Sequence, residues 1–198
     1  MSEEGEFAAL GPKALRPLRR TEYDQLVEAG AFADERLELL RGSLVSMSPQ
    51  GVSHSFIVRE LHELLLIALR GKAKVLCQMP IALSDDSEPE PDVAVVPLSL
   101  DNYAHAHPSK VLLIVEVADS SLWRDARIKA RLYAECGVPE FWLFDVESRS
   151  VRVHRGPSAD GWTTTEEHGA AAALRPLAFP EVEVKVSAVL PPAEKPTL

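Results

Sequence analysis

The stretch Val111-Leu-Leu-Ile-Val-Glu-Val-Ala118 decides the fold, because it is apolar on both of its alternating faces. A strand of this kind is typical of the centre of a sheet that is covered on both sides. Glu116 interrupts the apolar run, and a buried carboxylate is costly unless it is paired or binds a cation. The stretch therefore predicts a central strand whose acid has a structural or chemical role.

The segments on either side of this stretch indicate an α/β fold. Residues 52–70 repeat apolar side chains at helical spacing, and residues 74–83 and 91–96 are apolar runs of strand length. Downstream, residues 123–136 have helical spacing, and residues 138–146 form another apolar run. The expected core order is helix, three strands, helix, strand, with a mixed central sheet. Mixed strands with flanking helices are typical of α/β proteins.

Shorter segments are expected to extend this core. Residues 36–47 predict two strands that turn at Gly42, and the Thr21-Glu-Tyr-Asp24 pattern predicts the start of a short helix. Residues 150–155 and 162–168 are expected to add extra hairpin strands to the sheet.

The length of the chain, 198 residues, fits one domain with short extensions. We expect a flexible N-terminal arm at residues 1–19 and a single domain at residues 20–188. A disordered tail is expected at residues 189–198, where prolines and polar residues are frequent.

The composition narrows the class of protein. The net charge of -9 predicts no strong bulk attraction to nucleic acid, although a local basic face can coexist with it. Two cysteines without CxxC spacing, Cys77 and Cys136, are expected to be buried free thiols, which suits a reducing compartment. The sequence has no apolar run of membrane-spanning length and no signal-peptide pattern. We therefore expect a cytoplasmic protein without membrane contact.

Two acids stand at core strands. Asp92 follows Pro91 at the start of one apolar run, and Glu116 lies inside the next. Two carboxylates on neighbouring strands can hold a hard divalent cation such as Mg²⁺. Asp92 taken alone is more readily explained as a turn residue after proline, so the pair is more specific than either member.

The helix predicted at residues 123–136 has its positively charged side chains on two different sides. Helical spacing places Lys129 on the same side as Leu132 and Tyr133, whereas Arg127 and Arg131 fall on the opposite side, toward water. An inward lysine needs a carboxylate or an anionic ligand. Glu116 is the expected neighbour, either as a structural ion pair or as part of a site.

Several segments together resemble a known family. They are Arg36-Leu-Glu-Leu-Leu-Arg-Gly42, His54, Glu90-Pro-Asp-Val-Ala-Val-Val96, Val115-Glu-Val117, Lys129 with Tyr133, and Gly137-Val-Pro-Glu-Phe-Trp-Leu-Phe-Asp145. As a set, they resemble the Uma-type family of putative restriction endonucleases, within the PD-(D/E)xK nuclease superfamily. The resemblance covers residues 20–188 and implies a restriction-endonuclease-like core, whose element order agrees with the one expected above.

The resemblance implies roles for three catalytic residues. Asp92 matches the acid of the PD motif, and Glu116 matches the acid of the (D/E)xK motif. Ala118 stands where the superfamily pattern has lysine, so Lys129 of the following helix is the expected substitute.

Further residues are expected to support these three. We expect the backbone carbonyl of Val117 to complete a site for Mg²⁺ or Mn²⁺ together with Asp92 and Glu116. Glu38 is expected to act as an accessory acid. His54, at the start of an amphipathic stripe, is either a packed or capping residue, which is the commoner case, or a contact to a phosphate or to one of the ligands. Arg41 departs from the family pattern, which typically has an acid at that position.

The function expected from the resemblance is metal-dependent hydrolysis of DNA phosphodiester bonds. A homodimer is expected, formed through the apolar Phe141-Trp142 strand and the hairpin after it. Two alternatives stay open: a non-catalytic nuclease-fold module for oligomerisation or partner binding, and a hydrolase of small phosphoesters. The acidic net charge and the displaced lysine favour the first alternative, and the absence of a basic groove would favour the second.

Overall fold

The structure of the chain is a computed structural model that describes residues 16–118 and 123–192, and the side chains only from residue 127 in the second range. Most of the predicted arm (residues 1–15) and of the predicted tail (residues 193–198) lies outside the described residues. None of the helices in the described part of the chain has the length and apolar character needed to span a membrane.

The chain divides into two compact units. The first comprises residues 1–48 and 82–89, and the second comprises residues 49–81 and 90–198. The core elements expected from the sequence, from the helix at residues 52–70 onward, all belong to the second unit.

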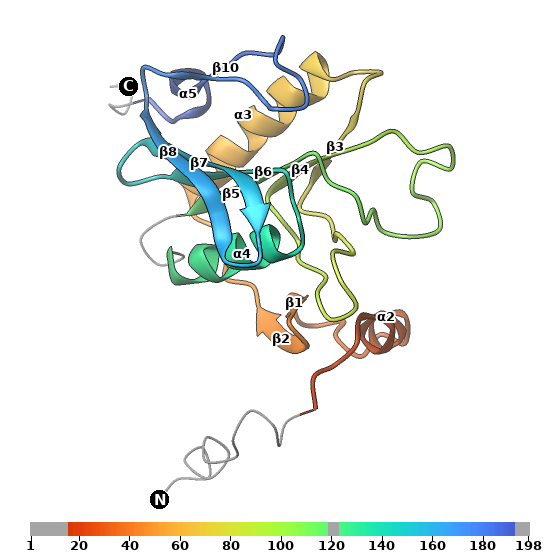
Figure 1. The fold of residues 1–198 in the computed structure, drawn as a ribbon. Coiled ribbons are helices and arrows are strands. Elements are labelled where there is room, and N and C mark those ends of the chain that lie inside the picture. The colour runs from red at the N-terminus through yellow and green to blue at the C-terminus, as the bar shows by residue number, and fades with distance from the viewer. Residues whose placement is uncertain (1–15, 119–122, 193–198) are drawn as a thin grey trace, which may run out of the picture. The chain divides into compact units, whose positions relative to one another are not determined.

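A short helix, α2 (Arg20–Glu28), opens the first unit (Figure 1). It begins one residue before the predicted start at Thr21, because Arg19 caps it. Glu22 is the third residue after Arg19, and its Oε2 accepts the Arg19 backbone N–H at 2.9 Å. This contact stabilises the first turn at Arg20, so the predicted start is corrected by one residue.

A tight hairpin follows, formed by β1 (Leu37–Leu40) and β2 (Ser43–Ser46). Its turn has positive φ angles at Arg41 (51°) and Gly42 (75°), which suit a two-residue hairpin loop. A Cβ atom at Gly42 would lie 2.3 Å from Cβ of Pro17, so only glycine fits there. The structure confirms the predicted turn at Gly42.

The second unit is built on one six-stranded sheet (Figure 1). Its strand order is β3-β4-β5-β6-β7-β8, with β5 and β6 parallel and the other neighbours antiparallel. The mixed sheet expected from the sequence is therefore confirmed. The strands are β3 (Lys74–Cys77), β4 (Val93–Val96), β5 (Leu113–Ala118), β6 (Glu140–Asp145), β7 (Ser150–Ser158) and β8 (Gly161–Gly169).

Two helices cover opposite faces of this sheet. The helix α3 (Val52–Ala68) packs on β3, β4 and β5, and α4 (Trp123–Glu135) packs on β5 to β8. The order α3, three strands, α4, strand is the expected restriction-endonuclease-like core. All six residues of β5 are buried, as its apolar sequence predicts. A small two-stranded sheet of β9 (Ala173–Leu174) and β10 (Val184–Lys185), followed by α5 (Val186–Val189), completes the unit.

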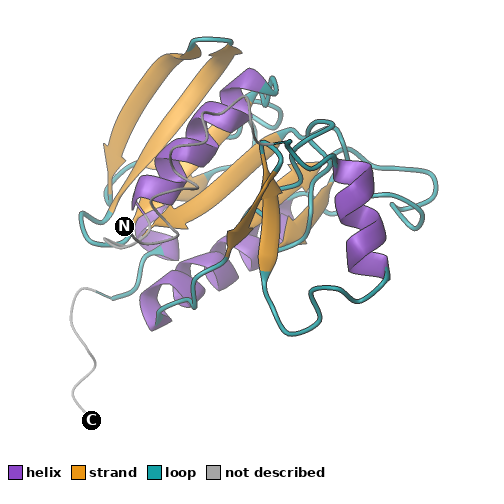
Figure 2. Ribbon diagram, turned by 90° about the horizontal axis from the view of Figure 1, so that it is seen from below, coloured by secondary structure: helices purple, strands orange, loops and turns teal. Residues whose placement is uncertain are grey.

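Some strand boundaries differ from those expected. The strand predicted for residues 74–83 ends at Cys77, because Gln78 adopts a positive φ of 50° that leaves the strand conformation. The hairpin strands β7 and β8 are longer than predicted and form a long ribbon at one end of the sheet (Figure 2).

The prediction of which surface would form a dimer is wrong in part. Phe141 and Trp142 are fully buried, because both faces of β6 are covered: Phe141 packs on Tyr133 of α4, and Trp142 belongs to the apolar core of the unit. They therefore offer no surface to a second chain. The strand β8, which ends the sheet and has mostly exposed side chains, is the part of the predicted surface that remains accessible.

A fully buried acid, Glu140, has a structural role. Its Oε1 accepts hydrogen bonds from Trp142 Nε1 at 3.0 Å and from Arg155 Nε at 2.8 Å. Its Oε2 accepts the backbone N–H of Leu177 at 2.6 Å. Glu140 thereby joins β6, β7 and the segment before β10, and a buried carboxylate satisfied in this way needs no cation.

An aromatic stack packs beneath α4 and contains His154 of β7. The imidazole stacks on Phe141, with ring centroids 5.3 Å apart, and lies 5.7 Å from the ring of Trp162. Its Nδ1 is 2.9 Å from the hydroxyl of Thr165. Burial, together with the charge of Arg152, lowers the pKa of His154 from 6.5 to about 4.

The lowered pKa predicts a pH dependence of stability. Between about pH 6.5 and pH 4, His154 is neutral in the folded chain and binds a proton on unfolding. The free energy of unfolding should therefore fall as the pH decreases through this window. In a His154→Gln variant, the difference between urea unfolding at pH 7 and at pH 5 should be smaller than in the native chain. Equal differences in the two proteins would contradict the assignment, and an NMR titration of the ring should give a midpoint near pH 4.

Candidate active site

The two core acids lie in one row across the sheet. In the antiparallel register of β4 and β5, Val93 is opposite Val115, and continuing it by one residue places Asp92 opposite Glu116. Residues opposite each other on antiparallel strands point to the same face, with Cβ atoms about 4.5–5.5 Å apart. Asp92 lies one residue before β4, so the register places it next to the end of the paired strands, and the side-chain contacts show where each carboxylate points.

Asp92 is held in place by hydrogen bonds to both of its oxygens. Its Oδ2 accepts the backbone N–H of Val117 at 2.8 Å and lies 3.1 Å from Nε2 of His54, in the first turn of α3. Its Oδ1 receives a longer contact, 3.4 Å, from Nε2 of Gln78. The side chain of Asp92 is buried and fixed in one orientation, so it is not merely a turn residue after proline.

Glu116 contacts two side chains of α4. Lys129 Nζ lies 3.2 Å from Oε1 of Glu116, and the hydroxyl of Tyr133 donates to the same oxygen at 2.5 Å. Lys129 and Tyr133 are four residues apart, so both project from the same side of the helix. Glu116 and Lys129 are each only 7% exposed, which makes this a buried ion pair.

The inward position predicted for Lys129 agrees with its burial. Leu132 and Tyr133 on the same side are buried, whereas Arg127 and Arg131 are exposed. Arg131 also forms a surface ion pair with Glu135 at 2.9 Å. Among the side chains of α4 that the structure describes, Lys129 is thus the cation that reaches the sheet.

Two contacts in this cluster were not anticipated from the sequence. The hydroxyl of Tyr133 on Glu116 could have been expected from its four-residue spacing after Lys129. The contact of Gln78 with Asp92 had a weaker signal, a single amide at the end of an apolar run. Val117 contributes its backbone N–H to Asp92, and the role predicted for its carbonyl stays a prediction.

Glu38 belongs to the first unit, where it is buried on β1 opposite Val45 of β2. The other residues of the predicted site, from His54 to Lys129, all belong to the second unit. The accessory role predicted for Glu38 stays a prediction.

The donor atoms of the row suit a small hard cation. Carboxylate oxygens are the ligands that Mg²⁺ and Mn²⁺ prefer, and Asp92 and Glu116 supply them from neighbouring strands. Within the described ranges, no three His, Cys, Asp or Glu side chains are grouped to enclose a metal ion. Mg²⁺ usually keeps several waters and binds one or two carboxylates together with substrate phosphates. The residues present therefore fit an open, substrate-completed site better than a closed structural one.

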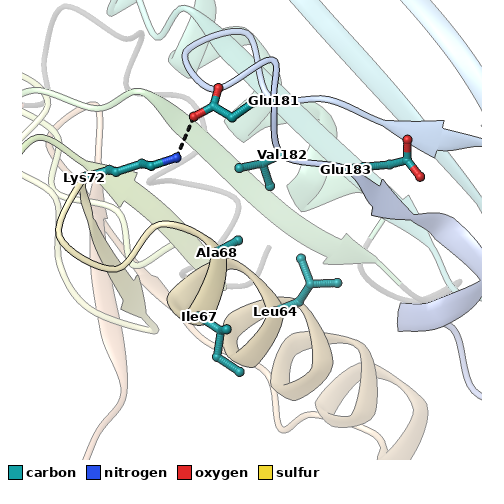
Figure 3. A pocket seen from close by; sticks show the side chains of 7 residues that line it. All are labelled: Leu64, Ile67, Ala68, Lys72, Glu181, Val182 and Glu183. Atoms are coloured by element: carbon teal, nitrogen blue, oxygen red, sulfur yellow. Dashed lines mark hydrogen bonds and ion pairs between the residues drawn. The ribbon is translucent and has the colours of Figure 1, made fainter.

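A groove elsewhere on the second unit has different chemistry (Figure 3). It lies between the end of α3 and the segment before β10, and an ion pair between Lys72 and Glu181 at 2.7 Å crosses it. His54 and Ile67 are thirteen residues apart on α3, which corresponds to about 20 Å along the helix. The groove is therefore distinct from the acid row. Its volume is about 530 Å³, and it is lined by Leu64, Ile67, Ala68, Lys72, Glu181, Val182 and Glu183.

The fold and the acid row define a restriction-endonuclease-like α/β protein. The sequence model of Uma2, a family described as "Putative restriction endonuclease", matches residues 20–187. The chain belongs to the Uma2 family. A search of curated proteins gave no match.

A solved structure shows the same fold. It is the crystal structure of a putative nuclease belonging to DUF820 from Anabaena variabilis ATCC 29413. The two chains share 19% sequence identity with a TM-score of 0.70, over 87% of this chain and 97% of that chain. At this identity, the likeness shows a shared fold and nothing more.

Proposed function

We propose that the chain is a metal-dependent endonuclease that hydrolyses DNA phosphodiester bonds with Mg²⁺ or Mn²⁺. The observation that carries the proposal is the contact between Lys129 Nζ and Glu116 at 3.2 Å, beside a row that also holds Asp92. Glu116 and Lys129 are in contact although they come from a strand and a helix, and Asp92, directly before the neighbouring strand, accepts the N–H of Val117 next to Glu116. Membership of a family described as "Putative restriction endonuclease" supports DNA as the substrate.

Each residue of the cluster has a role in this proposal. Asp92 and Glu116 would hold the cation, assisted by the carbonyl of Val117. A bound divalent cation would lower the pKa of an attacking water and stabilise negative charge on the phosphate. Lys129 would donate hydrogen bonds to that water or to a phosphate oxygen and would hold Glu116 in orientation. His54, whose Nε2 lies 3.1 Å from Oδ2 of Asp92, would fix that oxygen.

Two alternatives predict different outcomes. A non-catalytic module would bind neither Mg²⁺ nor Mn²⁺ at millimolar concentration, because its Glu116–Lys129 pair would be purely structural. A hydrolase of small phosphoesters would act on a soluble diester but would show no salt-dependent affinity for DNA. The homodimer expected from the sequence also stays a prediction, and its surface would have to include β8 rather than β6.

The proposal predicts strictly cation-dependent cleavage of DNA. Purified chain should nick or linearise supercoiled plasmid with Mg²⁺ or Mn²⁺ at roughly 10 mM, because Mg²⁺ at such sites is held by only one or two carboxylates together with substrate phosphates. Excess EDTA should abolish cleavage, and added Mn²⁺ should restore it. Cleavage that persists in EDTA would exclude the proposed site. Cleavage of bis(p-nitrophenyl) phosphate without cleavage of any DNA form would favour the small-substrate alternative.

A further inference from the structure

Gln78 has an unusual backbone conformation beside the acid row. Its φ of 50° lies in the left-handed region, which is unfavourable for residues other than glycine, asparagine and aspartate. Four other non-glycine residues in the described part of the chain have positive φ, namely Arg41, Asn102, Tyr103 and Arg149, and all four lie in turns or loops between elements. Gln78 likewise lies in a connection between elements, directly after β3, and it is distinguished by its two contacts with Asp92.

The left-handed conformation lets Gln78 contact Asp92 twice. The register of β3 and β4 places Cys77 opposite Val93, so Gln78 and Asp92 are the next pair. The backbone N–H of Gln78 donates to the carbonyl oxygen of Asp92 at 3.1 Å, and its side-chain Nε2 lies 3.4 Å from Oδ1. Gln78 directly follows β3 and Asp92 directly precedes β4, so their contact lies at the end of the paired strands, next to Val93 and its partners Cys77 and Val115.

One of these two contacts, from the Gln78 side-chain amide, reaches the Asp92 carboxylate, and the other reaches the Asp92 backbone carbonyl. Val117 N–H and His54 hold Oδ2 from one side, and the Gln78 amide approaches Oδ1 from the other. A neutral amide orients a carboxylate without cancelling its charge, whereas a lysine or arginine at this place would compete with a cation. The long Gln78 contact leaves Oδ1 more weakly bound than Oδ2, so Oδ1 is the oxygen better able to accept a cation.

We propose that Gln78 is a positioning residue that holds the Asp92 carboxylate ready for its cation. The inference rests on the proposed function for the cation, but the hydrogen-bond geometry that it requires is independent of any metal. A strained backbone maintained next to a site is the pattern expected where local conformation serves function rather than stability.

Two variants separate the amide from the backbone strain. Gln78→Gly removes the amide and relieves the strain, whereas Gln78→Met removes the amide and keeps both strain and volume. Asn102→Gly is the matched control, because it changes another left-handed residue (φ 55°) in an exposed loop. The thermal midpoint should rise or stay unchanged for Gln78→Gly, since glycine prefers this conformation.

The first measurement needs no metal. The Val117 amide proton reports its hydrogen bond to Asp92 Oδ2, and its signal in an NMR spectrum of labelled chain should move upfield in both Gln78 variants. Asn102→Gly should leave this signal in place. An unchanged Val117 signal in both Gln78 variants would overturn the proposal, whatever the enzyme does.

The second measurement uses Mn²⁺ as the probe. In calorimetric titrations, both Gln78 variants should bind Mn²⁺ about ten-fold more weakly than the native chain, the scale expected when a group that orients a ligand is lost. Affinities of both variants within two-fold of native would overturn the role in cation binding. If the native chain itself binds no Mn²⁺, the proposed function fails, and the Val117 signal alone then decides whether Gln78 orients Asp92.

Discussion

An Asp92→Asn variant is expected to lose cation-dependent cleavage of plasmid DNA by on the order of a thousand-fold, while its fold is retained. Asparagine has nearly the same shape, and its amide oxygen can still accept the N–H of Val117, 2.8 Å from Oδ2 in the native chain. The change removes the negative charge that the cation requires. The measurement is the initial rate of nicking at saturating Mg²⁺, together with the affinity for Mn²⁺.

The matched control for this variant is Glu63→Gln on the exposed side of α3. It removes one negative charge from the same unit without touching the acid row, and its cleavage rate should equal that of the native chain. The thermal midpoint of Asp92→Asn should stay within a few degrees of native, which corresponds to about 1 kcal/mol or less. Native-like cleavage by a well-folded Asp92→Asn chain would refute the proposed active site.

A Lys129→Met variant is expected to lose both stability and cleavage. Removing the amine leaves Glu116 buried with one partner of its ion pair missing, which typically costs about 3–5 kcal/mol. The side chains of the pair are 9% and 10% exposed, so solvent screening reduces this cost only slightly. Urea unfolding measures the stability, and plasmid nicking should fall by about a hundred-fold or more, the scale of a lost transition-state donor.

The double variant Glu116→Gln with Lys129→Met distinguishes catalysis from structure. It removes both charges, so most of the stability lost in Lys129→Met should return. Cleavage should not return, because a cation ligand and the lysine are then both absent. A double variant that regains native cleavage would show that the pair is only structural. Arg131→Met removes a surface partner of Glu135 on the same helix and should change stability little.

Much of the fold could be predicted because its signals are local. The apolar run at residues 111–118 predicted a central strand, and the turn at Gly42 followed from one glycine between two apolar segments. The element boundaries were less predictable. Gln78 ends β3 early through a backbone angle that its residue type does not favour, and Arg19 caps α2 through a contact of Glu22.

Part of the site could also be predicted. Helical spacing indicated that Lys129 faces inward, and an acid inside an apolar strand indicated that Glu116 needs a partner. The burial of Phe141 and Trp142 could not be predicted in the same way. An apolar strand has the same sequence pattern whether its own chain or a second chain covers it, and here α4 and the apolar core of the same chain cover its two faces.

The sequence by itself therefore determined which charged residues lie at or within apolar segments of the core, namely Asp92, Glu116 and Lys129. Only the tertiary structure decided that Gln78 contacts Asp92, and that Tyr133 and Lys129 meet on one carboxylate oxygen. The physical reason is the range of the interactions. Periodicity and burial preference act over a few residues, whereas strand register and the direction of a helix over a sheet depend on contacts between distant segments.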